Sequence, residues 1–314
     1  MGRARFAAAV VGPPLAVAVA LAAWGTLVEP RLLDRRDEIG WVPGLARAWD
    51  GQRLALFSDP QVGLWLGNVD TVRRAVHTVV RERPALALIA GDFVYNAARR
   101  PKRAVDQVVD VVRPLAEAGI ASYAVLGNHD YAEEGVGSGR QAAGVARALR
   151  QQLERGGIRV LHNEAVALPA PRGEDSPVYR SGGEDPPLYL VGIGPRRVGE
   201  DRPLQALAQV PEGAPRLVLM HNPRSFAELP ARSAPLALAG HTHGGQIRLP
   251  FKPEWTLARL RKRWPQYAEG WIDGERFGRP GNKLYVNRGL GFSMIPVRLG
   301  CPPELTFFTL RAPA

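Results

Sequence analysis

The stretch Gly240-His241-Thr242-His243-Gly244-Gly245 decides the fold, because it follows a short apolar run and places two histidines beside glycines. Short apolar runs bounded by polar residues are typical of buried strands. Because groups at the carboxyl ends of strands in one sheet converge on one crevice, four of the six histidines are predicted to meet there with Asp59 and Asp92. The other stretches that follow apolar runs are Ser58-Asp59-Pro60-Gln61, Gly91-Asp92-Phe93-Val94-Tyr95, Gly127-Asn128-His129-Asp130 and His221-Asn222.

The sequence between these stretches predicts an α/β fold. Strands before Asp59, Asp92 and Asn128 alternate with predicted helices, which is the signature of a parallel sheet covered by helices. The helices are expected over residues 69–83, 101–118 and 141–155. Shorter strands are expected at 159–161, 165–168, 188–193, 217–220, 236–239, 283–287 and 305–310. We find no internal repeat, so residues 53–314 are predicted to form one domain.

The N-terminal segment is apolar over residues 6–28 and follows Arg3 and Arg5. Its length matches a membrane-spanning helix, which needs about 20 residues. We therefore predict an uncleaved transmembrane signal anchor over 6–28 and a charged juxtamembrane connector over 29–52. The alternative is a secretory signal cleaved within residues 18–23. Arginines flank both ends of the apolar segment, which leaves its orientation in the membrane open.

The composition is that of a globular protein with a strongly basic balance. Apolar residues make up 46% and charged residues 23%, which excludes a chain that is disordered throughout. The net charge of +11 indicates anionic lipid, nucleic acid or merely an arginine-prone genome, with nucleic acid the least favoured. Cys301 is the only cysteine, so an intramolecular disulfide is excluded.

The chemistry of the recurring stretches indicates a metal centre. Carboxylate, amide and imidazole groups are ligands that suit Mn, Fe and Zn. Two such metals that share a carboxylate form a clamp for displacement at phosphorus. The neighbouring glycines permit tight turns and close approach of the backbone to a metal or phosphate.

The order of these stretches resembles the calcineurin-like metallophosphoesterase family, over about residues 54–310. The resemblance implies a four-layer α/β/β/α sandwich, here preceded by the N-terminal transmembrane helix. Within the family, four segments look like a bacterial membrane-associated branch typified by a Bacillus phosphoesterase, which is also similar to certain UDP-2,3-diacylglucosamine pyrophosphatases. These segments are GHTHGGQI (240–247), YAEG (267–270), YVNRGLG (285–291) and CPPEL (301–305).

The resemblance also implies a dinuclear centre of divalent or mixed-valence Mn, Fe or Zn ions. A metal-bound hydroxide would attack phosphorus. His129 would protonate the leaving oxygen or stabilise the charge on the phosphate, and Asp130 would orient the His129 imidazole. Asp92 would bridge both metals. One metal would be completed by Asn128, His221 and His241, and the other by Asp59 and His243.

The first stretch departs from the family pattern, which has a histidine two residues after the first aspartate. This chain has Gln61 there, whose amide oxygen is a weaker ligand than imidazole for transition metals. Tyr95 resembles the Gly-Asp-x-x-Tyr of purple acid phosphatases, in which tyrosinate binds a ferric ion. We hypothesise that Tyr95, alone or with Gln61, completes the first metal. The alternatives are that Tyr95 lines the pocket and that Gln61 is a hydrogen-bonded turn residue.

Aromatic and basic residues alternate over residues 251–271, a segment that includes Trp255, Arg263 and Trp264. Such a mixture suits a membrane interface or an anionic lipid head group. A lid with a solvated basic face is the alternative, and single-stranded nucleic acid is a third.

Together these features predict a membrane-anchored, dinuclear phosphoric ester hydrolase. Its substrate is expected to be a phosphomonoester, phosphodiester or pyrophosphate, with a lipid-linked phosphate favoured over a phosphorylated small molecule. A UDP-2,3-diacylglucosamine-type pyrophosphatase of lipid A synthesis is the rival within enzymes. A catalytically degenerate protein that binds a partner is the rival of another class, and only Gln61 favours it. The oligomeric state is left open.

Overall fold

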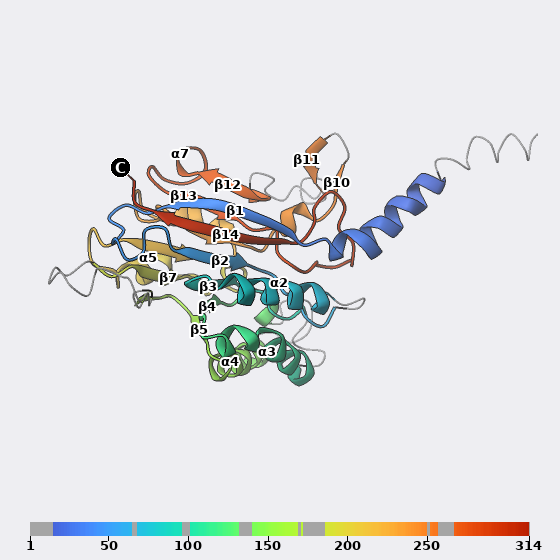
Figure 1. Ribbon diagram of the computed structural model, residues 1–314, viewed down its shortest axis with the longest axis horizontal. Helices are drawn as coiled ribbons and strands as arrows, with labels where there is room; N and C mark the ends of the chain where they lie inside the picture. Colours follow the sequence, from blue (N-terminus) through green and yellow to red (C-terminus); the bar gives the residue numbers. More distant parts are fainter. Residues whose placement is uncertain are drawn as a thin grey trace, which may run out of the picture.

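The computed structural model describes residues 15–64, 68–95, 101–131, 140–168, 171, 186–249, 252–256 and 267–313. Two six-stranded sheets dominate this part of the chain and lie face to face (Figure 1). Both sheets are mixed, and the first contains the parallel strands predicted from the apolar runs. The prediction of an α/β fold is therefore confirmed.

The first sheet has the strand order β1-β14-β2-β3-β4-β5. Strands β2 to β5 run parallel, β14 is antiparallel to β2, and β1 is parallel to β14. The strands span Asp34–Trp41 (β1), Arg53–Phe57 (β2), Leu86–Ala90 (β3), Ala121–Val125 (β4), Ile158–Leu161 (β5) and Glu304–Arg311 (β14).

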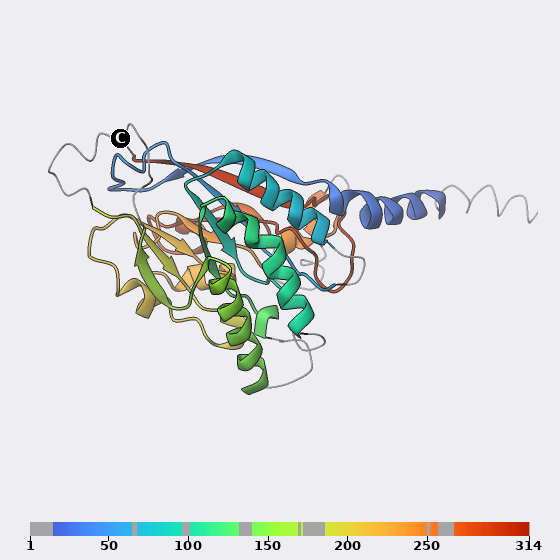
Figure 2. The ribbon, with the colours of Figure 1, turned by 60° about the horizontal axis from the view of Figure 1, so that its bottom comes forward.

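Three helices cover the outer face of this sheet: α2 (Val69–Glu82), α3 (Pro101–Glu117) and α4 (Arg140–Arg155) (Figures 1 and 2). Each ends within one residue of its predicted end and begins within one residue of its predicted start. Burial of one apolar side, such as Val72, Val76 and Val79 of α2, holds the helices on the sheet. Side chains on the opposite sheet face, among them Leu54 and Leu56, pack instead between the two sheets.

The second sheet has the strand order β12-β13-β9-β8-β7-β6. Its outer face is covered by short helices, with Leu207 of α5 and Phe226 of η6 in the cluster that packs there. The four predicted layers are thus unequal, because the outer cover of this sheet contains no helix as long as α2 among the described residues. The strands span Glu164–Ala167 (β6), Tyr189–Gly192 (β7), Arg216–Leu219 (β8), Ala237–Ala239 (β9), Gly270–Asp273 (β12) and Lys283–Val286 (β13). The short helices are η5 (Arg196–Val198), α5 (Pro203–Leu207), η6 (Pro223–Glu228) and α7 (Gly274–Phe277).

Strand β1 was not predicted, because it lies inside the expected juxtamembrane connector over residues 29–52. Its sequence, DRRDEIGW, is too charged to show the alternation of a half-buried strand. The strand is held by an eight-residue ladder with β14 and by ion pairs, such as those of Arg35 with Glu82 and of Asp37 with Arg53. The folded body therefore begins ahead of residue 53.

About half of the aromatic and basic segment over 251–271 falls outside the described residues. Within it the structure describes β11 (Lys252–Thr256), which pairs with β10 (Arg248–Leu249), and the chain from Tyr267 onward. Trp264 and the basic residues near it lie outside the described part, so their proposed roles stay predictions.

Residues 15–23 form a helix that continues into η1 (Trp24–Val28) and η2 (Glu29–Arg31) and projects from the body (Figure 1). None of the helices in the described ranges is both long and apolar enough to cross a membrane. The predicted anchor over 6–28 begins outside these ranges, and its role in spanning a membrane stays a prediction.

Candidate metal centre

The predicted ligands follow the carboxyl ends of strands from both sheets. Asp59, Asp92 and Asn128 come just after β2, β3 and β4 of the first sheet. His221 comes after β8, and His241 follows β9 in the second sheet. Hydrogen bonds connect these turns across the sandwich, for example from the backbone nitrogen of His241 to Oδ2 of Asp59 at 3.0 Å. The structure therefore brings together the turns that carry these side chains.

Asp92, His221 and His241 form a compact cluster whose potential ligand atoms lie within 4.8 Å of one another. Nε2 of His221 lies 3.2 Å from Oδ2 of Asp92 and 3.0 Å from Nδ1 of His241. Nδ1 of His221 lies 2.7 Å from the carbonyl oxygen of Ala90. Because a carbonyl only accepts, Nδ1 carries a proton, and a neutral His221 would direct its Nε2 lone pair at the Asp92 carboxylate. That arrangement is stable only with a cation or a proton between them.

The pKa values of these groups are shifted by burial and by the charges that lie next to one another in the cluster. Burial alone would lower the pKa of His221, but the charge of Asp92 raises it to about 9. Burial also works against ionised Asp92, yet the charges of His221 and His129 lower the pKa of this carboxyl below its usual range. Burial and the charge of His221 hold the pKa of His241 well below its usual value. The pocket therefore favours one shared positive charge beside the carboxylate, which a metal ion can supply.

Asp59 and His243 form a second group next to this cluster. Nε2 of His243 lies 3.5 Å from Oδ1 of Asp59, and its Nδ1 lies 3.3 Å from the carbonyl oxygen of Gly291. Both side chains are buried. Asp59 also accepts a hydrogen bond from the backbone nitrogen of His241, so the second group lies directly beside the first cluster.

Buried oxygens without a hydrogen-bond partner are the strongest sign that this site suits a cation. Among the described residues only five buried side-chain atoms lack such a partner, and three belong to predicted ligands. These three are Oδ1 of Asp59, Oε1 of Gln61 and Oδ1 of Asn128. An unsatisfied buried acceptor costs about 1–3 kcal/mol, and all three are acceptors that a hard or borderline cation binds. The residues present therefore fit metal ions.

Gln61 uses one end of its amide and leaves the other unused. Its Nε2 donates to Oδ2 of Asp92 at 3.0 Å. Because an ionised carboxylate only accepts, the nitrogen must face Asp92, and Oε1 is left buried without a partner. Gln61 is thus both a hydrogen-bonded turn residue and a candidate oxygen ligand.

The backbone at this centre is strained. Five predicted ligands have left-handed backbone angles, which non-glycine residues seldom adopt and which cluster at functional sites. Their φ values are 51° for Asp59, 48° for Gln61, 54° for Asp92, 75° for His241 and 51° for His243. Gly127 permits the closest approach, since a Cβ there would lie 2.1 Å from Oδ1 of Asp92. The turns are therefore shaped to bring ligands together at a cost in backbone energy.

Comparison with known proteins agrees with this geometry. Residues 52–245, more than half of the chain, match the family described as calcineurin-like phosphoesterase. The chain belongs to the calcineurin-like phosphoesterase family. The matched range begins at β2 and ends at Gly245, so it includes every predicted metal ligand. As a calcineurin-like phosphoesterase, the chain is a metal-dependent enzyme that hydrolyses phosphoric esters, and the partner-binding alternative is set aside.

Curated relatives cover most of this calcineurin-like chain. Phosphodiesterase YaeI of Escherichia coli is 31% identical over 75% of the chain and 74% of its own length. The uncharacterized metallophosphoesterase YkuE of Bacillus subtilis is 23% identical over 91% of the chain and 88% of its own length. UDP-2,3-diacylglucosamine pyrophosphatase LpxG of Chlamydia trachomatis is 25% identical over 93% of both. The chain is thus homologous, at low identity, to this Bacillus protein and to the UDP-2,3-diacylglucosamine pyrophosphatase.

The structure corrects the role predicted for Asp130 in this calcineurin-like site. Asp130 does not orient the His129 ring: its Oδ1 accepts from the backbone nitrogen of Val94 and its Oδ2 from that of Gly127. Nδ1 of His129 lies instead 2.8 Å from the carbonyl oxygen of Tyr95, and the two rings stack at 5.4 Å. Burial and the charge of Asp92 raise the pKa of Asp130 to about 7. Asp130 therefore braces two ligand-bearing turns, whereas Tyr95 positions His129.

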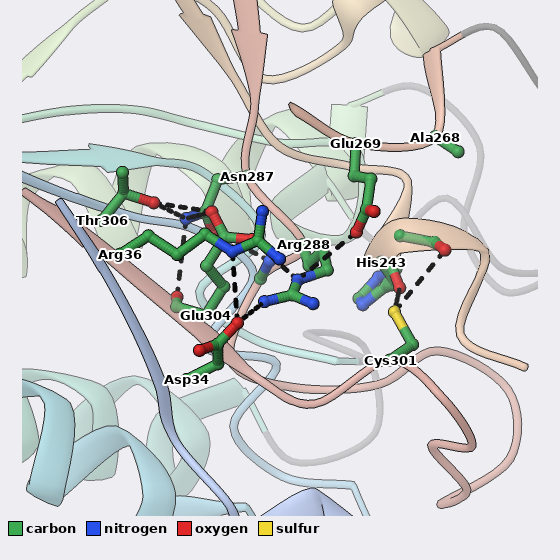
Figure 3. Close-up of polar contacts among 12 residues, drawn as sticks. Asp34, Arg36, His243, Ala268, Glu269, Asn287, Arg288, Cys301, Glu304 and Thr306 are labelled. Carbon is green, nitrogen blue, oxygen red and sulfur yellow. Dashed lines mark hydrogen bonds and ion pairs between the residues drawn. The ribbon is translucent and has the colours of Figure 1, made fainter. Parts of the chain in front are cut away.

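A buried network of charges behind His243 was missed by the sequence interpretation. Figure 3 shows Arg288 between Glu269 on one side and Asp34 and Glu304 on the other. Cys301 lies next to it, with Sγ 3.2 Å from the carbonyl oxygen of His243. The segments YAEG, YVNRGLG and CPPEL contain Glu269, Arg288, Cys301 and Glu304, so their similarity to the membrane-associated branch was the available signal.

Proposed function

We propose that this chain is a dinuclear phosphodiesterase that acts on a phosphate ester at a membrane surface. The observation that carries the proposal is the trio of buried, unpartnered oxygens of Asp59, Gln61 and Asn128 beside the Asp92–His221–His241 cluster. Two separate groups of ligands that meet at Asp59 and Asp92 support two ions more readily than one. Mn, Fe and Zn all suit these ligands.

Both ions would be held by side chains already in place. Asp92 would serve both ions, with Asn128, His221 and His241 on one and Asp59, Gln61 and His243 on the other. When bound, the pair supplies an activated water and charge stabilisation at phosphorus. The protein contributes the rigid, buried and strained turns that fix the ligands before substrate arrives.

His129 is the proposed proton donor to the leaving oxygen. Its Nδ1 hydrogen is held by the Tyr95 carbonyl, so Nε2 is the nitrogen that exchanges a proton with substrate. Its backbone nitrogen donates to Oδ1 of Asp92 at 2.8 Å, which sets the ring beside the metal cluster. A positioned general acid contributes about 10²–10⁴-fold to the rate.

Two observations support a phosphodiester as the substrate and a membrane as its location. The relative from Escherichia coli is named a phosphodiesterase, and it covers three quarters of this chain. The apolar run over residues 6–28 supports a single-pass membrane location, with the orientation of the catalytic domain left open.

A UDP-2,3-diacylglucosamine-type pyrophosphatase is the second candidate. The relative that carries this name in Chlamydia trachomatis aligns over 93% of both chains. A substrate with acyl chains and a pyrophosphate would also suit a membrane location. Hydrolysis of this nucleotide sugar by the purified chain, faster than hydrolysis of a simple diester, would select this candidate.

Tyr95 has two proposed roles that a substitution separates. The stacking of its ring on His129 supports a role in lining the pocket. A ferric tyrosinate would instead give the iron-loaded protein a visible purple or pink colour, which Tyr95→Phe would remove. Iron-loaded protein without colour would exclude Tyr95 as a ligand.

The deciding experiment is hydrolysis by the full chain in detergent, loaded in turn with Mn, Fe and Zn. Mono-, di- and pyrophosphate substrates are compared for the wild type, Asp92→Ala and His129→Ala. We expect metal-dependent cleavage of the diester that is lost in Asp92→Ala and reduced at least about 100-fold in His129→Ala. Unchanged rates in both variants would refute the proposed site.

A further inference from the structure

The loop between β13 and β14 connects the metal centre to the N-terminal helix. At one end the carbonyl oxygen of Gly291 lies 3.3 Å from Nδ1 of His243. At the other end the backbone nitrogen of Arg298 donates to the carbonyl oxygen of Gly25 at 2.8 Å. Figures 1 and 2 both show this loop beside the point where the helix leaves the body. The wall of the site and the base of the helix are thus only a few residues apart.

This loop presents two large apolar side chains to solvent. Met294 is 48% exposed and Ile295 is 42% exposed. The backbone holds them outward, because the buried side chain of Gln246 accepts from the nitrogen of Ser293 at 3.0 Å and donates to the carbonyl of Ile295 at 2.7 Å. Met294 has a φ of 66°, a strained angle for a residue with a side chain. Two hydrogen bonds with Gln246 and a strained backbone angle therefore hold Met294 and Ile295 in this exposed position.

The neighbouring helix is apolar on every side. Residues 15–23 are all exposed, and among them Leu15, Val17 and Val19 are each 60% exposed. A helix that is hydrophobic all round belongs in lipid or in a protein core. In the sequence the apolar run extends back to residue 6, and among the described residues nothing covers 15–23. The run is long enough to enter a bilayer, which favours lipid over a protein partner as its surroundings.

Basic residues stand at the base of this helix. Arg74 of α2 donates from Nη2 to the carbonyl oxygen of Arg31 at 2.8 Å, and both side chains are exposed. Arginines at the foot of an apolar helix favour anionic lipid head groups. The exposed loop, the apolar helix and these two arginines therefore lie together where the helix joins the body.

We propose that the loop formed by residues 293–297 and the helix formed by residues 15–28 make one docking surface for an anionic lipid bilayer. This surface brings the wall of the metal centre, through Gly291 and His243, to the level of the head groups. The substrate class is then a phosphate ester that resides in the bilayer. That last step rests on the proposed function, whereas the docking surface does not.

The test measures lipid contact at the loop in the full chain. Ile295→Cys is labelled with an environment-sensitive fluorophore, and Leu204→Cys is the matched control, because Leu204 of α5 is 61% exposed. Cys301 is fully buried, so the introduced cysteine is the one that reacts. The chain is reconstituted into vesicles of phosphatidylethanolamine and phosphatidylglycerol that contain a doxyl-labelled lipid. We expect severalfold stronger quenching of the label at 295 than at 204.

Equal quenching at both positions, or absence of quenching at 295, would overturn the proposal. Protection of the label at 295 that increases with protein concentration at a fixed detergent concentration, without vesicles, would indicate a second copy of the chain as the occupant and would also overturn it. Quenching needs no hydrolysis. A chain that docks through residue 295 but cleaves no phosphoester would therefore refute the proposed function alone, and a chain that cleaves but does not dock would refute this inference alone.

Discussion

Gln61 stands where the calcineurin-like pattern has a histidine, and its buried amide is only half used. The nitrogen donates to Asp92, while the oxygen has no hydrogen-bond partner. An amide oxygen binds hard cations such as Mn²⁺ relatively well and softer ones less well than imidazole does. We therefore expect this single residue to affect which metals the centre accepts.

Substitution of Gln61 should therefore change metal binding. Gln61→Leu removes the unpartnered oxygen and the bond to Asp92, so it should weaken binding of the more loosely held metal by about 10–100-fold. Gln61→His should instead tighten Zn²⁺ relative to Mn²⁺. Competition with a chromophoric chelator measures both affinities. Wild-type affinities in the two variants would mean that Gln61 is a turn residue only.

Gly127 offers a second prediction. A Cβ at this position would lie 2.1 Å from Oδ1 of Asp92, so Gly127→Ala should destabilise the fold by about 3 kcal/mol. Gly144 is the control, because it is exposed in α4 and has no atom near an added Cβ. Gly144→Ala should stabilise the chain by about 0.5–1 kcal/mol. Urea denaturation measures both changes, and a shift of the same sign in both variants would contradict the account.

At the level of residues, the grouping of Asp92 with His221 and His241 could be predicted, whereas the contacts that position His129 could not. Asp92, His221 and His241 follow from the order of short motifs, and the structure brings them together. The role of Asp130 was wrong, because the sequence does not reveal that backbone amides of Val94 and Gly127 would take both of its oxygens. Arg298 was not singled out, since an arginine that is fully buried among carbonyl oxygens looks the same in sequence as a surface arginine.

At the level of elements, the periodic spacing of apolar residues was enough to predict the long helices. The helices α2 to α4 pack one apolar side on the sheet, so their spacing was visible and their limits were nearly right. Strand β1 is stabilised by backbone pairing and ion pairs, neither of which leaves an apolar pattern. The expected connector therefore concealed a strand that completes the first sheet.

The buried ion pair between Arg288 and Glu304 of β14 gives a third prediction. Arg288 donates from Nε to Oε2 of the fully buried Glu304 at 2.7 Å. Arg288→Met would leave this carboxylate without its cation, at a cost of about 3–5 kcal/mol in unfolding free energy. Arg311→Met is the control, because its pair with Asp50 is exposed and should be worth less than about 1 kcal/mol. Equal losses in a denaturant titration would show that the network does not stabilise the fold.

At the level of the whole molecule, the two sheets and the N-terminal segment meet around the metal centre. The carboxyl ends of strands from both sheets supply the ligands, and the loop before β14 links them to the helix that projects from the body. The sequence predicted this sandwich from its motifs, but the contact between Gly25 and Arg298 joins parts too distant in the chain for any local pattern to reveal.

The most direct test of the account is the number of metal ions bound by the full chain. The protein is stripped with a chelator, dialysed against Mn²⁺ and analysed by mass spectrometry for metal per chain, alongside Asp92→Asn. We predict two ions in the wild type and fewer than one in the variant, because Asp92 lies between the two groups of ligands. No bound metal in the wild type, or the same number in both proteins, would contradict it.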